Sequence, residues 1–180
     1  DYREDVLFSE EVVRKLNASY FALRNCFRFM LGNLDGFTAN EMLPYDKLAT
    51  VDKWVLAELV ELEKRARRHY EDFEFHRFYS AFKTFCDVTL SSDYFDILKD
   101  RLYCDSRGSD SYRAARTVLY NLCSAMARMI SPILVHTAEE IWEHLRGMLP
   151  VEQSVHLALW PKMDERWVDE QLRVQFEQIG

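Results

Sequence analysis

The chain has 180 residues, of which 48% are hydrophobic and 29% are charged, so it can bury a core and fold. Only 5 glycines and 4 prolines are present, which excludes collagen-like and low-complexity sequences and disfavours all-β folds with many turns. The formal net charge of −7 disfavours a nucleic-acid partner unless the basic residues gather in particular parts of the chain.

The first predicted helix begins at Ser9, a favourable N-cap residue followed by Glu10 and Glu11, which suit the positive end of the helix dipole. Apolar residues then recur every three or four positions, and this pattern ends near Asp35-Gly36. We therefore expect a long amphipathic helix. Its predicted core side chains are Val13, Leu16, Tyr20, Leu23, Phe27, Met30, Leu31 and Leu34.

Two further helices are predicted in the middle of the chain. The second begins near Thr50 or Asp52, and the third begins near Glu74 and either continues through Leu90-Ser91-Ser92 or breaks there. The aromatic residues of the third helix recur at helical spacing, which is typical of a core and not of a cofactor site. The predicted core residues of the two helices are Val55, Leu59, Leu62, Ala66, Phe75, Phe78, Phe82, Phe85, Thr89, Leu90, Tyr94, Ile97 and Leu98.

The fourth predicted helix carries an apolar stripe between Ala115 and Ile130, and Pro132 stops it. Thr137-Ala138-Glu139-Glu140 matches a capping box, which predicts that a short helix opens there and continues through Trp142. Residues 150–160 have irregular composition, with 155–159 as a candidate short strand.

A last, acidic helix is predicted from about Asp164. The whole pattern predicts an all-α bundle of about five to six helices. Residues 1–150 form this bundle, and residues 151–180 form an irregular segment and an acidic helix at the C-terminal edge of the same domain.

The cysteines and the absence of targeting segments indicate a cytoplasmic protein. No run of about 18 apolar residues is present, and the charged first residues lack the apolar segment of a signal peptide. The four cysteines, none in a C-x-x-C pair, fall within or beside apolar helical patterns, so we expect free, reduced thiols. They are Cys26, Cys86, Cys104 and Cys123.

The basic residues are unevenly distributed. Four basic residues and no acidic residue lie between Arg14 and Leu34, and four basic residues accompany a single Asp110 between Ser106 and Ala138. The first and fourth helices are therefore expected to be locally positive on an acidic protein.

A helical wheel gathers these charges into two strips. Arg14, Asn17, Phe21, Asn25 and Arg28 share one flank of the first helix. On the fourth helix a second set falls opposite the apolar stripe, with Arg128 somewhat to one side: Arg113, Arg116, Thr117, Tyr120 and Ser124. Cations suit phosphates and exposed aromatic rings suit unstacked bases, so the strips indicate RNA contact, although an ordinary solvated charged face has the same composition.

A third basic run, Lys64-Arg65-Ala66-Arg67-Arg68-His69, lies in the last turns of the second predicted helix. Cations are favourable at that end of a helix dipole, so a solvated helix end explains the run as well as an RNA-binding patch does.

No catalytic or metal-binding constellation is visible. The sequence lacks a Gly-rich phosphate loop, G-x-S-x-G and H-E-x-x-H. His136, Glu140 and His144 are spaced for one helix face, but three side chains that capping and surface roles explain do not make a metal site. We therefore predict no catalytic residue and no metal site in this chain.

Several segments nevertheless identify the chain as similar to bacterial-type isoleucyl-tRNA synthetases, which are class I enzymes. The similar segments occur in the family's order and at its separations over nearly the whole chain. They are Asp1-Tyr2-Arg3-Glu4-Asp5-Val6, Leu23-Arg24-Asn25-Cys26-Phe27-Arg28-Phe29-Met30-Leu31-Gly32-Asn33-Leu34, Asp52-Lys53-Trp54, Phe75-His76, Lys99-Asp100-Arg101-Leu102-Tyr103, Ser131-Pro132-Ile133-Leu134 with Thr137-Ala138-Glu139-Glu140-Ile141-Trp142, and Glu152-Gln153-Ser154-Val155-His156-Leu157.

The resemblance implies a helical-bundle anticodon-binding domain that follows a catalytic domain. The family's two ATP-site signatures, His-Ile-Gly-His and Lys-Met-Ser-Lys-Ser, are absent, and the zinc-binding cysteines of many members would lie beyond Gly180. The chain is thus expected to be an excised domain without a cofactor of its own and inactive alone, whereas the parent enzyme would use ATP to attach isoleucine to its tRNA.

The resemblance also implies which residues meet the anticodon stem and loop of an isoleucine tRNA. Arg24, Asn25 and Arg28 are the first candidates, because their family-like motif coincides with the basic flank of the first helix. Arg113 and Arg116 are the second candidates, and they rest mainly on the helical wheel. Asn25 could instead cap or bridge within the bundle, and Arg24 could snorkel or pair with an acid.

Two alternatives remain open at this point. The chain could be the equivalent domain of a valyl- or leucyl-tRNA synthetase. It could also be a structural or protein-interaction bundle that does not bind RNA, in which the basic strips are ordinary surface. Asp52 and Trp54 match a family motif, but a residue in the N-terminal turn of a helix and a packed indole explain them without RNA.

Overall fold

The computed structural model describes residues 9–178, so the family-like segment at residues 1–6 lies outside the described residues. The described part is helical and contains no β-strand, which confirms the predicted all-α fold. Its helices are α1 (Glu10–Asn33), η1 (Ala39–Glu41), η2 (Tyr45–Lys47), α2 (Thr50–Glu71), α3 (Phe75–Thr84), η3 (Phe85–Tyr94), α4 (Phe95–Tyr103), α5 (Asp110–Ile130), α6 (Val135–Arg146), η4 (Glu165–Trp167) and α7 (Glu170–Glu177). Three of these elements, η1, η2 and η4, are short 3₁₀ turns, and η3 is a π-helix.

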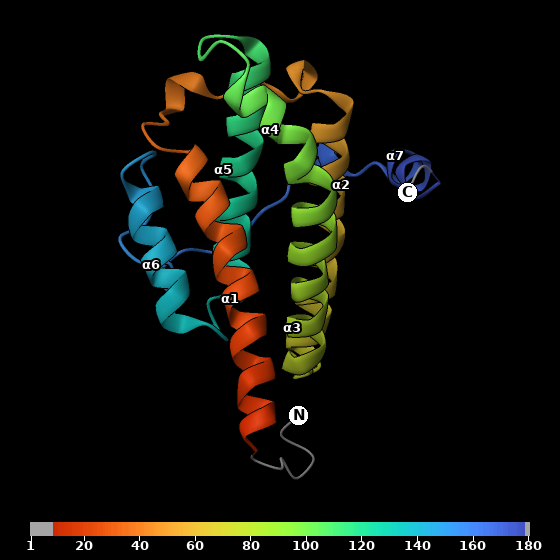
Figure 1. Cartoon of the computed structure of the whole chain (residues 1–180), viewed down its shortest axis with the longest axis vertical. Helices are drawn as coiled ribbons and strands as arrows, with labels where there is room; N and C mark the ends of the chain where they lie inside the picture. Colours follow the sequence, from red (N-terminus) through yellow and green to blue (C-terminus); the bar gives the residue numbers. More distant parts are fainter. Residues whose placement is uncertain (1–8, 179–180) are drawn as a thin grey trace.

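The helix α5 lies at the centre of the bundle (Figure 1). It packs against α1, α2, α4 and α6, so it is surrounded on most sides. The segment after α6 crosses the back of the bundle in Figure 1 and carries α7 to α2, where Arg173 bonds to Glu58 at 2.7 Å and Phe176 stacks on Trp54. The core therefore lies around α5, and the C-terminal segment crosses the rear face of the bundle.

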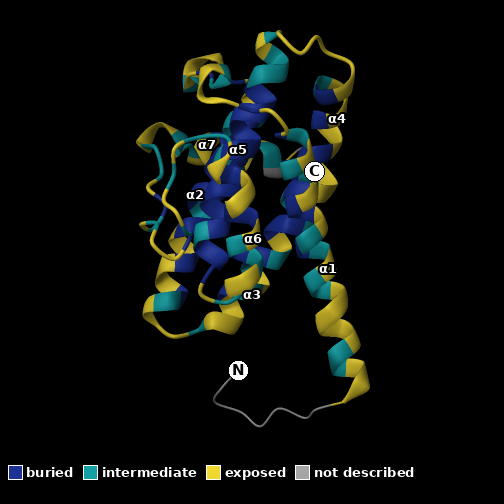
Figure 2. Cartoon of the chain, turned by 90° about the vertical axis from the view of Figure 1, so that its left-hand side faces the viewer, coloured by how far each residue is buried: buried dark blue, intermediate teal, exposed yellow. Residues whose placement is uncertain are grey.

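The helix α1 starts as predicted, because Ser9 Oγ accepts a hydrogen bond from the backbone N–H of Val12 at 3.2 Å. The first two turns of α1 extend beyond the bundle, and Figure 2 shows them exposed or only partly buried. Leu16, predicted to be a core residue, is therefore 59% exposed. The apolar pattern continues past the point where any neighbouring helix is available to cover it.

The predicted third helix continues without a break through η3 and into α4. The ten residues of η3 form a π-helix, and two serine hydroxyls support its wider turn. Ser91 Oγ donates to the carbonyl of Cys86 at 2.7 Å, and Ser92 Oγ donates to the carbonyl of Asp87 at 3.0 Å. Phe75 at the start of this helix and Ile97 near its end, both predicted core residues, are 38% and 48% exposed.

The predicted capping box at Thr137 is wrong, because α6 begins two residues earlier at Val135 and its N-cap is Leu134. Both side chains of the predicted box have long-range partners instead. The Thr137 hydroxyl lies 3.1 Å from the hydroxyl of Tyr20, and Glu140 pairs with Arg24, so α6 is fixed to α1.

The predicted strand at 155–159 is also wrong, because this segment forms turns. Glu139 of α6 explains its shape, since the carboxylate accepts the backbone N–H of Val155 at 3.0 Å and the hydroxyl of Ser154 at 2.8 Å. The last helix starts later than predicted. Asp164 caps the 3₁₀ turn η4 by accepting from the N–H of Arg166, and Asp169 caps α7 by accepting from the N–H of Leu172.

All four cysteines are free: Cys26, Cys86 and Cys123 are buried and Cys104 is exposed. Burial raises the pKa of the Cys86 and Cys123 thiols, which keeps these groups protonated and unreactive at neutral pH.

A buried ionic network joins the two sides of the bundle. Asp52 has no exposed surface, and its carboxylate accepts two hydrogen bonds from the guanidinium of Arg101, at 2.7 and 2.8 Å. It also accepts from the hydroxyl of Tyr94 at 2.7 Å and from the backbone N–H of Ala49 at 3.2 Å. Burial lowers the pKa of Arg101, but the hydrogen bonds and Coulomb attraction to Asp52 outweigh this, so its pKa lies above the ordinary value.

The motif residues Asp52 and Trp54 are thus explained by packing. Asp52 caps α2 and holds Arg101, and Trp54 is 8% exposed against α7. Arg101 extends the network to α5 by donating to the backbone carbonyl of Ser111 at 3.0 Å.

We expect Asp52→Asn to lower the free energy of unfolding by about 3–5 kcal/mol, since the exchange leaves the half-buried Arg101 without a counter-charge. Urea denaturation followed by circular dichroism measures this change. Asp96→Asn is the matched control, because Asp96 makes the same kind of pair with Lys99 at 2.8 Å on the exposed surface of α4. Equal midpoints for the two variants would contradict a stabilising role for the buried network.

Candidate nucleic-acid interface

The flank of α1 predicted from the helical wheel is exposed along its whole length. Arg14, Asn17, Phe21, Asn25 and Arg28 are all exposed, and we call them the α1 strip. At 1.5 Å per residue the strip is about 21 Å long, comparable to several nucleotides of an RNA strand. The opposite face of the same helix supplies buried core residues: Leu23, Cys26, Phe27 and Met30.

Asn25 and Arg28 are free to bind a ligand. Within residues 9–178 neither side chain has a hydrogen-bond or ion-pair partner. The alternative that Asn25 caps or bridges within the bundle is therefore not what the structure shows. Phe21, one turn away, is 59% exposed and presents its ring to solvent.

The strip continues to Gly32, which the sequence analysis did not single out. Gly32 is exposed, and no atom lies within 4 Å of the position a Cβ would take. A ligand lying along the strip can therefore approach the helix backbone closely at this end. The sequence spacing already places Gly32 on this face, because it follows Arg28 by four residues, in the same three- and four-residue steps that relate the strip residues to one another.

Arg24 lies beside the α1 strip and is held by an acid. Its guanidinium donates to Glu140 of α6 at 2.9 Å and to the hydroxyl of Tyr20 at 3.2 Å. The hydrogen bond to Tyr20 and the attraction of Glu140 raise the pKa of Arg24. Because its side chain is still 41% exposed, Arg24 can add positive potential to the strip, but its orientation is set by α6.

The predicted exposed face of α5 is wrong. Arg116, Thr117, Tyr120 and Ser124 are buried, because the segment between α1 and α2 and the segment after α6 cover α5 on the side opposite its apolar stripe. A helical wheel finds the more polar face of a helix, and at the centre of a bundle that face is also covered.

Arg116 is used entirely within the fold. Its guanidinium donates to the carbonyl oxygens of Asn33 and Asp35, at 3.1 and 2.6 Å, and to the carboxylate of Glu41 at 2.6 Å. The rings of Phe37 and Tyr112 each lie 5.3 Å from its central carbon. Arg116 therefore satisfies carbonyls at the C-terminal end of α1 and fixes the loop that follows.

Arg113 is also tied to the bundle, although it is nearer the surface. It donates to the carbonyl of Asn40 at 3.1 Å and lies 3.5 Å from Asp110, and its side chain is 28% exposed. The structure thus leaves the five predicted contact residues in three situations: Asn25 and Arg28 free, Arg24 and Arg113 partly exposed and paired, and Arg116 buried.

The basic run near the end of α2 is largely neutralised. Lys64 pairs with Glu61 at 2.6 Å, Arg67 pairs with Glu63 at 2.6 Å, and His69 lies 3.2 Å from Glu74. Only Arg65 and Arg68 of this run have no partner in the described part of the chain.

Among residues 9–178 no group of three or more His, Cys, Asp or Glu side chains is placed to hold a metal ion. Over the same residues no helix has the length and apolar character needed to cross a membrane. What the α1 strip offers chemically is cations, an amide and an exposed ring, which together suit phosphates and unstacked bases.

Comparison with known proteins points the same way. The family model described as "Anticodon-binding domain of tRNA ligase" matches residues 52–179. The chain is 37% identical to isoleucine–tRNA ligase of Thermotoga petrophila and 39% identical to that of Syntrophotalea carbinolica, over 99% of its own length in both cases. It is 40% identical to isoleucine–tRNA ligase of Brevibacillus brevis over 92% of its length. It spans about a fifth of the length of these relatives, between 18% and 20%.

We expect Arg116→Ala to destabilise the fold by about 3 kcal/mol, because the exchange leaves Glu41 and the carbonyls at the end of α1 without their donor. Urea denaturation measures the loss. Arg28→Ala removes the same group from the free surface of α1 and is expected to leave the midpoint unchanged. An Arg116→Ala variant as stable as the parent chain would show that this side chain does not hold the loop after α1.

Proposed function

The chain belongs to the family of anticodon-binding domains of tRNA ligases, and from this premise we propose that it binds the anticodon stem and loop of an isoleucine tRNA through the α1 strip. The observation that carries the proposal is the pair of free, exposed side chains Asn25 and Arg28 beside the exposed ring of Phe21. Polar side chains that have no partner within the described structure are available to bind a ligand from outside.

Each residue type in the strip has a role that its chemistry suggests. Arg14 and Arg28 contact phosphates and position the RNA, which carries no sequence information by itself. The Asn25 amide, with a donor and an acceptor, reads the edge of an unpaired base. Phe21 supplies a surface on which an unstacked base can lie.

Arg24, Arg113 and Arg116 support this interface in different ways. Arg24 is partly exposed and adds positive potential beside the strip, and Arg113 is a partly exposed cation that holds the loop after α1. Arg116 acts through the loop after α1, whose position it fixes, and is not itself proposed to touch the RNA. The local positive charge of α1 matters because the protein as a whole repels RNA at long range.

The relatives named above support isoleucine tRNA over the tRNAs for valine or leucine. By the same reasoning the chain is part of a longer isoleucine–tRNA ligase, in which a catalytic domain in the same polypeptide uses ATP to attach isoleucine to the tRNA. That parent enzyme would act in the cytoplasm, and any zinc site of the family type would lie outside this chain. The domain alone contributes binding and no chemistry.

We expect the double variant Arg14→Ala, Arg28→Ala to weaken binding of an isoleucine-tRNA anticodon stem-loop. The double variant should also lower the slope of log affinity against log salt by roughly one to two units, since about one counterion is released per phosphate contact. A fluorescence titration at several salt concentrations measures both quantities. Asn25→Ala should instead reduce the preference for the native loop over a scrambled loop.

The matched control is Arg65→Ala, Arg68→Ala, which removes the same two charges from unpaired arginines on α2. If this control weakens binding as much as the α1 variant does, the strip is not the interface and general charge attraction is responsible. If the unsubstituted chain binds neither loop at low salt, the proposal is overturned for the isolated domain, and the bundle is structural.

A further inference from the structure

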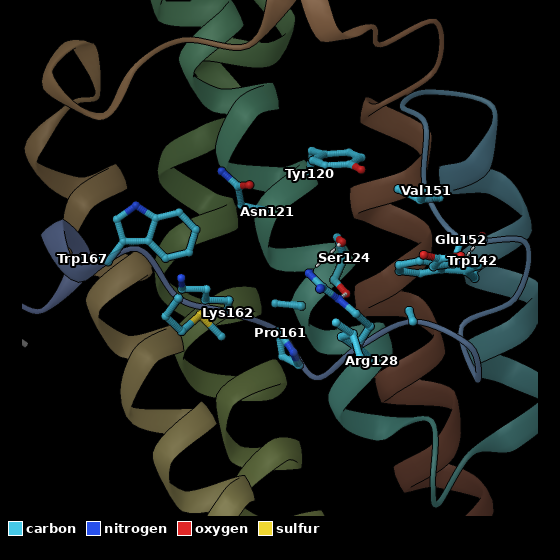
Figure 3. Close-up of a pocket in the computed structure, with 14 residues that line it drawn as sticks. Tyr120, Asn121, Ser124, Arg128, Trp142, Val151, Glu152, Pro161, Lys162 and Trp167 are labelled. Carbon is cyan, nitrogen blue, oxygen red and sulfur yellow. Dashed lines mark hydrogen bonds between the residues drawn. The ribbon is translucent and has the colours of Figure 1, made fainter.

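A cavity of about 390 Å³ lies on the rear face of the bundle, away from the α1 strip (Figure 3). Its floor is α5, its side wall is α6, and the segment between α6 and α7 (residues 147–169), which we call the strap, borders it on the outside. Figure 3 shows Trp142 and Trp167 at opposite sides of the cavity, with Asn121, Ser124 and Arg128 of α5 between them. The volume falls within the range of roughly 300–1,000 Å³ that small-molecule sites occupy.

Arg128 in this cavity is a half-buried guanidinium without an acid. Its contacts are local: Nε donates to the carbonyl of Ser124 at 3.1 Å, and Nη2 donates to the hydroxyl of the same residue at 3.3 Å. Nη1 has no hydrogen-bond partner among the described residues. The guanidinium lies 6.0 Å from the ring of Trp142, so one face of the cation is covered by an aromatic surface.

This situation differs from that of the other arginines that lie partly or wholly inside the fold. Arg101, Arg113, Arg116 and Arg173 each pair with a carboxylate. Burial lowers the pKa of Arg128, whereas carboxylates raise the pKa of Arg101 and Arg173. A desolvated cation normally has a counter-anion, and here the protein supplies none.

Two more polar side chains in the cavity have no partner within residues 9–178. These are the amide of Asn121, which is half-buried, and the ammonium of Lys162, which is exposed. Glu152 is the single acid in the lining, and it forms no ion pair. The cavity therefore carries an excess of positive charge on an acidic protein, together with an amide and two indole rings.

We propose that this cavity binds a nucleoside monophosphate, either free or as one nucleotide of a single-stranded RNA. The phosphate is held by Arg128 and Lys162, because a doubly charged group matches two separate cations. The base lies against the partly exposed indole ring of Trp167, and the Asn121 amide pairs with the edge of the base, an arrangement that suits adenine best. The proposal goes beyond anticodon binding, because the cavity is built from α5, α6 and the strap and contains no residue of α1.

The experiment is a titration of the 180-residue chain with adenosine monophosphate, observed by ¹H–¹⁵N NMR of the four tryptophan indole groups. Trp142 and Trp167 line the cavity, so their indole signals should shift, whereas the signal of Trp54, which stacks on Phe176 of α7, should not. Inorganic phosphate and adenosine, each carrying half of the ligand, are expected to bind at least tenfold more weakly than the nucleotide.

Variants assign the site. Lys162→Ala, an exposed and unpaired position that cannot unfold the bundle, should weaken nucleotide binding several-fold, and Arg128→Gln should weaken it tenfold or more. Arg28→Ala should leave nucleotide binding unchanged, and Lys162→Ala should leave stem-loop binding unchanged, so the two proposals fail separately. A tetra-adenylate that binds more tightly than the mononucleotide assigns the site to RNA, and the reverse order assigns it to free nucleotides.

The proposal is overturned if millimolar adenosine monophosphate moves no indole signal, or if the Trp54 signal moves as much as those of Trp142 and Trp167. It is equally overturned if the nucleotide binds the Lys162→Ala and Arg128→Gln variants as tightly as the parent chain.

Discussion

Asp52, a carboxylate with no exposed surface, fixes how α2, α4 and α5 are placed relative to one another. Its donors come from three places in the chain: the turn before α2, the end of η3 and the last turn of α4. These donors converge on two oxygen atoms only when α4 lies at one level along α2, so the network sets the register between the two helices. Arg101 then reaches Ser111 and fixes the start of α5 to the same point. Burying such a pair is costly in desolvation, which makes the complete set of hydrogen bonds necessary.

Arg116 performs the corresponding task for α1. It binds the last carbonyls of that helix and holds the following loop over α5, so the C-terminal end of α1 is anchored in the bundle. Glu140 and Thr137 hold the flank of α1 that faces α6. With these sides fixed, one long face of α1 stays exposed, and it is the face that carries the α1 strip. The candidate interface is thus a consequence of how the other faces are used.

Much of the fold could be predicted from the sequence because local signals decide it. Ser9 caps α1, Pro132 ends α5, and the apolar spacing of α2 and α3 places Leu59 and Phe78 in the core. The errors arose where a residue's partner is distant in the chain. Thr137 and Glu140 match a local capping box, yet Tyr20 and Arg24, more than 100 residues away, take both side chains. Residues 155–159 alternate like a strand, but Glu139 turns their backbone.

The candidate site, like the fold, could be predicted from the sequence only where local spacing decides which side chains are exposed. The periodicity of α1 was enough to define the strip, because that face has nothing packed on it. The same argument failed on α5, because periodicity does not reveal that residues 33–41 lie over Arg116. A helical wheel gives the direction of a side chain but not its neighbours, so exposure could be deduced only for a helix at the edge of the bundle.

Whether an arginine has an acid within reach is what distinguishes its possible roles in this protein. With 30 acidic residues against 23 basic ones, most arginines can find a carboxylate, and those inside the fold generally do. An arginine that remains unpaired in such a composition is therefore informative. An exposed, unpaired cation costs little free energy, because it stays hydrated. Arg28 therefore indicates a binding site only together with the free amide and the exposed ring beside it on the same face. Arg128 is different, because it has lost part of its hydration without gaining a counter-charge. An anion that enters the cavity would supply that counter-charge.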